Sequence, residues 1–137
     1  MQLFKIIDNH PKYFFYIPLV LYWILLLVLT SLPSNALPKQ AFSDKVNHFL
    51  AYFGLAVLLS GTLFYQKKNR FLSAKYLIST IVLSSFYGFL DELHQLFIPG
   101  RYAEFYDWVA NFIGALTGTF IFFLFLKIRE KKNSIEQ

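Results

Sequence analysis

Four long apolar segments, each cut off by charge or proline, constrain this chain more than any other feature of its sequence. They cover about 13–32, 46–65, 76–98 and 105–126. Each has about the 20 residues that an α-helix needs to cross a hydrocarbon core about 30 Å thick. The fold class that we predict is therefore all-α, a polytopic membrane protein built as a bundle of four transmembrane helices.

The composition supports this reading. Hydrophobic residues make up 56% of the 137 residues and charged residues only 15%, an excess that a small soluble domain would leave as exposed apolar patches. There is no cysteine, so disulfides and thiol chemistry are excluded. The sequence shows no internal repeat or low-complexity linker, which predicts a single domain over 1–137 with a flexible tail at about 127–137.

The first apolar segment has one alternative interpretation, as a cleaved secretory signal. Lys5 and Lys12 precede it, and Ser34-Asn35-Ala36 is similar to a small-residue cleavage site. Signal peptides have apolar cores of about 7 to 15 residues, and this segment is longer. We therefore favour a retained membrane anchor.

The distribution of basic residues predicts the orientation. In a four-span arrangement, ten Lys and Arg residues lie on the side of both termini and of the second loop, and three lie on the other side. The positive-inside rule then places both termini in the cytoplasm, in a multi-pass protein of the bacterial cytoplasmic (inner) membrane. Because the basic residues are spread along the membrane borders, we expect no nucleic-acid partner and take the lipid bilayer as the surroundings.

Charged and polar residues inside three of the segments need an explanation, because such residues are costly in a membrane. They are Asp44, Lys45, His48 and Tyr52 in the second segment, Asp91, Glu92, His94 and Gln95 in the third, and Asp107 and Asn111 in the fourth. Counted from the cytoplasmic border, Asp91, His48 and Asn111 lie at similar depths of about 22 to 25 Å. The sequence thus predicts one polar layer just inside the outer interface.

Helical spacing directs most of these side chains to one face of each helix, since they are separated by three or four residues. Glu92 is the exception, because it lies about 100° around the helix from Asp91. Further along the fourth segment, Gly114 and Gly118 form a small-xxx-small helix-packing pattern, which makes a homo-oligomer through this helix a candidate. We expect Gly118→Ile to disrupt packing and Phe122→Ile to have little effect.

Two alternatives apply to the polar layer itself. The acids could be neutralised by Lys45 and Arg101 in a purely structural cap, although five carboxylates on the outward side face only three Lys or Arg residues. A divalent ion held by His48, His94 and Asp91 or Asp107 is also conceivable. No His-Glu-x-x-His motif is present, so our prediction is no metal and no cofactor.

The polar residues resemble those of the VanZ-like membrane protein family. The resemblance rests on three motifs and one arginine: Asp44-Lys45-x-x-His48-Phe49-x-x-Tyr52-x-x-Leu55, Asp91-Glu92-x-x-Gln95, Arg101, and Asp107-x-x-x-Asn111-x-x-Gly114-x-x-x-Gly118. It covers about three of the four segments. The resemblance implies a bacterial cell-envelope protein, and the family's namesake is associated with resistance to the glycopeptide teicoplanin. It implies no established catalytic residue.

Three functions remain open from the sequence. The first is a binding module whose outward residues recognise an envelope lipid or lipid-linked precursor; its candidate ligand-binding residues are Asp44, Lys45, His48, Tyr52, Asp91, Glu92, Gln95, Arg101, Asp107 and Asn111. The second is a membrane-border enzyme that uses Asp91 or Glu92 as acid or base with His48 or His94. The third is a structural or assembly protein in which the polar layer locks the helices together.

Overall fold

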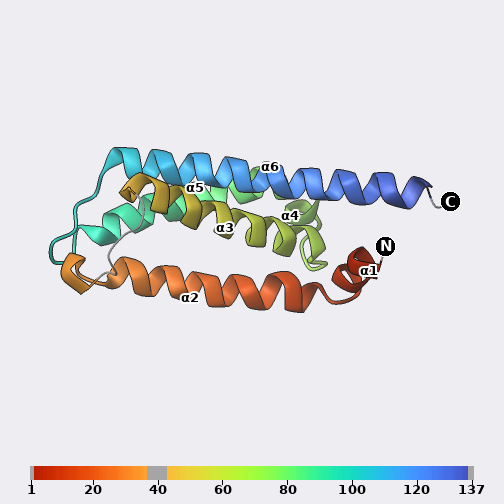
Figure 1. Cartoon of the computed structure of the whole chain (residues 1–137), viewed down its shortest axis with the longest axis horizontal. Helices are drawn as coiled ribbons and strands as arrows, with labels where there is room; N and C mark the ends of the chain where they lie inside the picture. Colours follow the sequence, from red (N-terminus) through yellow and green to blue (C-terminus); the bar gives the residue numbers. More distant parts are fainter. Residues whose placement is uncertain (1, 37–42, 136–137) are drawn as a thin grey trace.

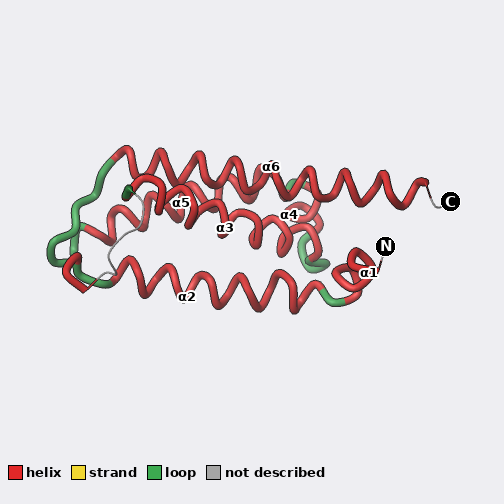
Figure 2. The backbone as a smooth tube through the Cα atoms, in the orientation of Figure 1, coloured by secondary structure: helices red, strands yellow, loops and turns green. Residues whose placement is uncertain are grey.

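The computed structural model describes residues 2–36 and 43–135, and this part consists of helices joined by loops, with no strand (Figure 2). The long helices are α2 (Ile17–Ser31), α3 (Asp44–Tyr65), α5 (Tyr76–Gln95) and α6 (Phe105–Ile135). The short helices are α1 (Gln2–Asn9) and α4 (Arg70–Ala74). A π-helical turn, η1 (Lys12–Tyr16), continues directly into α2, and a 3-10 turn, η2 (Ser34–Ala36), follows it. The all-α prediction is confirmed.

Three helical segments in this described part are long and apolar enough to cross a membrane. They are Lys12–Ser31, Asp44–Tyr65 and Phe105–Lys132. Helix α5 is not among them, although its 20 residues give it a length of about 30 Å. Asp91, Glu92 and the buried hydroxyl residues Thr80 and Ser84 make it less apolar. The predicted number of four spans is therefore not confirmed by length and hydropathy.

The four long helices lie side by side with their axes roughly aligned (Figure 1). At one end of the bundle α2 and α5 finish and α3 and α6 begin, and we call this the polar end. The opposite end carries α1, α4 and both chain termini, and we call it the basic end because Lys67, Lys68, Arg70 and Lys75 lie in its α3–α5 connection.

Helices α3 and α6 approach each other most closely where α6 presents glycine. A Cβ atom on Gly114 would collide with the carbonyl oxygen of Phe49, and one on Gly118 with that of Phe53. The small-residue face predicted from the sequence therefore packs against α3 of the same chain. Since both glycines are buried there, this face is not available to a second copy, and the predicted homo-oligomer draws no support from it.

One expectation for α6 is wrong. Phe122 does not face a tolerant surface, because only 2% of it is exposed and its ring packs edge-on against Phe15 and Phe64. With Ile7 and Leu126 it forms the apolar core of the basic end. Phe122 lies four residues beyond Gly118, so one face of α6 is buried first by α3 and then by this core.

Helix α5 ends three residues earlier than the predicted boundary at 98. After Gln95 the chain tightens into turns, in which Phe97 N–H donates to His94 O and Ile98 N–H to Gln95 O. Pro99 disfavours helical geometry in the residue before it, and Gly100 has φ +72°, which suits glycine. The turn is fixed to the end of α2, because Ser34 N–H donates to Pro99 O at 3.3 Å.

The tail predicted to be flexible at about 127–137 is helical as far as Ile135. Arg129 forms a 2.8 Å ion pair with Asp8 of α1, and Lys127 pairs with Glu130 on the next turn. Asp8 also accepts a 2.7 Å hydrogen bond from the Tyr65 hydroxyl of α3. The short amphipathic helix α1, which the sequence analysis did not predict, therefore fastens α6 to α3 at the basic end.

Candidate functional site

The polar residues predicted to share a layer do converge at the polar end of the bundle. We define the polar cluster by the ten predicted ligand-binding residues and one more, Glu104. In chain order these are Asp44, Lys45, His48, Tyr52, Asp91, Glu92, Gln95, Arg101, Glu104, Asp107 and Asn111. Helix α3 supplies the first four, α5 the next three, and the α5–α6 loop and the start of α6 the rest. Helix positions explain why acids start α3 and α6, because Asp44 and Asp107 lie in first turns, where the helix dipole favours negative charge.

Lys45 forms the exposed rim of the cluster. Its ammonium lies 2.9 Å from Glu104 Oε2 and 3.0 Å from Asp107 Oδ1, so one cation bridges two carboxylates. The side chains of Lys45 and Glu104 are about half exposed, whereas that of Asp107 is buried. Glu104 is one of the five outward carboxylates but was not among the predicted site residues; it lies in the loop directly before α6, three residues before Asp107.

His48 occupies the centre of the cluster and is buried. Its Nδ1 lies 3.0 Å from Asn111 Oδ1 and 3.6 Å from Glu92 Oε1. Both neighbouring atoms are oxygen acceptors, so a hydrogen on this nitrogen has acceptors within reach on α5 and α6. The other ring nitrogen, Nε2, lies 3.8 Å from Asp44 Oδ1. One imidazole therefore joins α3, α5 and α6.

Glu92 links the centre to the loop. Its Oε2 accepts the Glu104 backbone N–H at 3.2 Å, and its Oε1 lies 3.5 Å from Gln95 Nε2. Gln95 in turn accepts a 3.1 Å hydrogen bond from Arg101 Nε. The sequence placed Glu92 about 100° around α5 from Asp91, and the two acids do have different partners.

Asp91 lies on the side of the cluster nearer α2 and is also buried. Its Oδ2 accepts a 3.4 Å hydrogen bond from the Tyr52 hydroxyl. In the described ranges, no Lys or Arg forms an ion pair with Asp91 or Glu92. The pairing of Asp91 with Lys45 or Arg101 that a purely structural cap would use is thus not observed there.

His94 does not join His48. It is exposed, and its Nε2 lies 3.1 Å from the Ser31 hydroxyl at the end of α2. The metal set that would use both histidines is therefore not formed. The donors of Asp44, His48 and Asp107 do lie within 4.8 Å of one another, a spacing that could hold a cation. Lys45 already pairs with Asp107 there, and a metal ion would have to displace that ammonium.

The chemistry of the cluster follows from its charge balance. It contains the carboxylates of Asp44, Asp91, Glu92, Glu104 and Asp107, against the cations of Lys45 and Arg101. Asn111, which is fully buried, also has an Nδ2 with no hydrogen-bond partner. Such an arrangement can accept hydrogen bonds from amines and hydroxyls through its acids and can contact an anion through Lys45 and Arg101.

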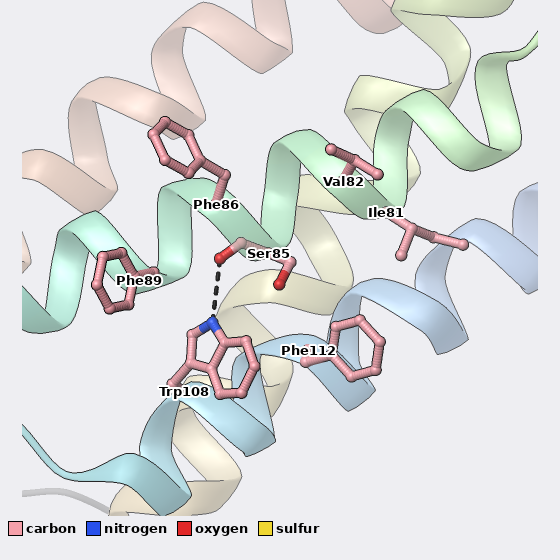
Figure 3. Close-up of a pocket in the computed structure, with 7 residues that line it drawn as sticks. All are labelled: Ile81, Val82, Ser85, Phe86, Phe89, Trp108 and Phe112. Atoms are coloured by element: carbon pink, nitrogen blue, oxygen red, sulfur yellow. Dashed lines mark hydrogen bonds between the residues drawn. The ribbon is translucent and has the colours of Figure 1, made fainter.

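An apolar groove of about 350 Å³ runs between α5 and α6 beside the cluster (Figure 3). Its walls are mostly aliphatic and aromatic side chains: Ile81, Val82, Ser85, Phe86, Phe89, Trp108 and Phe112. Trp108 Nε1 donates to the Ser85 carbonyl oxygen at 3.1 Å and so holds the indole across the two helices. The sequence analysis missed this groove, because it depends on how two helices pack.

The fold and the cluster define a class: a small helical membrane protein with an acid- and histidine-rich cluster at one end of its bundle. A family model described as VanZ/LLP1 matches residues 14–126, which is most of the chain. The chain therefore belongs to the VanZ/LLP1 family, and the resemblance stated from its motifs is confirmed. Comparison with curated proteins and with solved structures gave no match.

Proposed function

We propose that this VanZ/LLP1 protein binds the headgroup of an envelope lipid or lipid-linked precursor at its polar cluster. The observation that carries the proposal is that Asp91 and Glu92 are buried among helices without a Lys or Arg ion-pair partner in the described residues. Charge inside a membrane bundle is costly and typically marks a functional site. Carboxylates in this position suit a ligand that brings hydrogen-bond donors.

The orientation belongs to the same proposal. With the polar end outward, the basic end lies in the cytoplasm, as the positive-inside rule favours. Helix α5 then crosses the bilayer beside α3 and α6, which cover its polar face. The cluster would sit at the outer border, where lipid headgroups and wall precursors are found.

The charge balance of the polar cluster indicates which headgroup chemistry it would bind. Acids outnumber cations, which favours a group carrying an amine, while Lys45 and Arg101 on the more exposed side suit phosphate. We therefore expect an amine-containing zwitterionic headgroup to bind better than an anionic one. An association with teicoplanin susceptibility would follow if the ligand is a wall precursor or a lipid that surrounds it.

Lipid retention by the purified protein tests the proposal. The protein, in detergent with equal amounts of phosphatidylethanolamine and phosphatidylglycerol, is examined by native mass spectrometry, and we expect the ethanolamine lipid to be retained unchanged. Glu92→Gln should weaken retention about tenfold or more, since a hydrogen bond to a charged group contributes about 1.5 to 3 kcal/mol. Glu130→Gln, at an exposed ion pair of the basic end, is the matched control.

Two other outcomes of this experiment would support a different function. Chemical conversion of a lipid would support the enzyme in place of the binding module. Retention equal for both lipids and insensitive to Glu92→Gln would contradict headgroup binding and leave the cluster as a structural lock.

A further inference from the structure

The α5–α6 groove is in line with two acids of the polar cluster. On α5 the groove-lining residues follow helical steps through Ser85 and Phe89, and the next step of three residues reaches Glu92. Trp108, near the start of α6, lies four residues after Glu104, which is in the preceding loop. Glu104 N–H donates to Glu92 Oε2, so the apolar walls are followed along the helices by polar atoms.

The groove is long enough for part of an extended chain. From Ile81 to Phe89 it extends about 12 Å along α5. Its volume of about 350 Å³ and its aliphatic and aromatic walls suit an alkyl chain.

Apolar walls that end at polar atoms match an amphiphile. We propose that the α5–α6 groove holds an acyl chain of the same lipid whose headgroup binds the polar cluster; this inference rests on the function proposed above. Trp108 forms one wall of the groove, fixed by its hydrogen bond to Ser85, and the chain lies between this indole and the exposed side chains of Val82, Phe86 and Phe89. The site is thus bipartite, with the headgroup at Glu92 and Glu104 and the chain below them.

Fluorescence of Trp108 tests the inference directly. The chain has two tryptophans, so Trp23→Phe leaves Trp108 as the reporter. This protein is reconstituted in phosphatidylcholine vesicles that contain a small, increasing fraction of phosphatidylethanolamine brominated on its acyl chains. We expect quenching that saturates at a low fraction, because the probe replaces the lipid of one groove and not the whole surrounding layer.

Variants with a larger side chain in the groove provide the decisive comparison. Ser85→Phe and Val82→Phe should raise the brominated fraction needed for half-maximal quenching about tenfold. Leu83→Phe is the matched control, because Leu83 is exposed on α5 but does not line the groove, and it should change nothing. Both groove residues are at least partly exposed, and unchanged helical circular dichroism confirms that each variant is folded.

The outcomes separate this inference from the proposed function. Saturable quenching that is the same for brominated phosphatidylethanolamine and phosphatidylglycerol would support the chain site and contradict the headgroup proposal. Quenching that rises in proportion to the probe, with the ethanolamine lipid still retained in mass spectrometry, would overturn the groove and leave the headgroup site. A disulfide-linked dimer of Ser85→Cys, in a chain otherwise free of cysteine, would place a second copy over the groove and also overturn the inference.

Discussion

Asp91 shows at the scale of one residue how this cluster differs from a salt-bridged cap. Its Oδ2 accepts a 3.4 Å hydrogen bond from the Tyr52 hydroxyl, a long hydrogen bond between two buried groups. Buried carboxylates without a cation are costly to keep in a membrane bundle. Asp91 therefore belongs to the groups whose role the proposed ligand site would explain.

We predict that Asp91→Asn impairs envelope-linked function while membrane insertion and protein abundance stay nearly unchanged. The amide keeps the size of the side chain and can still accept from Tyr52, so the stability cost should be about 1 kcal/mol or less. Immunoblotting of membranes measures abundance, and teicoplanin susceptibility is the phenotype. Loss of abundance in parallel with function would show that Asp91 is structural, and normal values of both would make it an ordinary interfacial residue.

The residue scale also shows where sequence reasoning succeeded. Steps of three and four residues along a helix, combined with equal depth, were enough to predict that His48, Asn111 and Asp91 would share a layer. They could not identify Glu104, whose contact with Lys45 depends on the loop after Pro99. They also could not show that His94 turns to Ser31 of α2 and away from His48, because both directions are compatible with its position on α5.

At the scale of the helix, the contact between α3 and α6 depends on the absence of side chains. Gly114 and Gly118 bring the α6 backbone against the carbonyl oxygens of Phe49 and Phe53. Backbone carbonyls cannot move aside as a flexible side chain can. The polar cluster lies one to two turns away on the same two helices, so this contact also sets the distance between His48 and Asn111.

We predict that Gly118→Ile lowers the thermal stability of the purified protein by several degrees or prevents its folding. Overpacking typically costs about 1 to 3 kcal/mol, and here the obstacle is backbone. Phe120→Ile is the control, since Phe120 lies on the same helix and is 57% exposed; it should have little effect. Equal melting temperatures for the two variants in detergent would contradict the close packing of α6 on α3. Phe122→Ile is no longer a neutral control, because Phe122 is part of the core.

The ends of the helices were less predictable than their positions. The second apolar segment predicted the bounds of α3 to within two residues, because Lys67, Lys68 and Asn69 follow the helix and Ser43 precedes it. The extension of α6 to Ile135 depends on Asp8, more than a hundred residues away in sequence, and no local pattern carries that information. The eight residues of α1 bury Ile7 against α6 and Phe15, and their amphipathic pattern is a local signal that the sequence analysis did not use.

At the scale of the whole molecule, both termini lie at the basic end (Figure 1), so they would share one side of a bilayer crossed by all four long helices. We predict that this side is the cytoplasm. Fusions after Lys132 should give activity with a reporter that works in the cytoplasm and none with a reporter that requires export. Activity of the exported reporter at that position would reverse the orientation and place the polar cluster inside. A fusion in the loop after α2, at Ser34, should give the opposite pattern.

The burial of polar groups on α5 has a consequence for how the protein is made. During synthesis α5 leaves the ribosome before α6 exists, and alone it is the least suitable of the long helices for partitioning into lipid. Helices α2 and α3 are then available to cover it, and α3 meets its polar face through the buried contact of Ser60 with Thr80 and that of Tyr52 with Asp91. Entry of α5 into the bilayer should therefore depend on the helices made before it, and α6 should complete an already paired unit when translation ends.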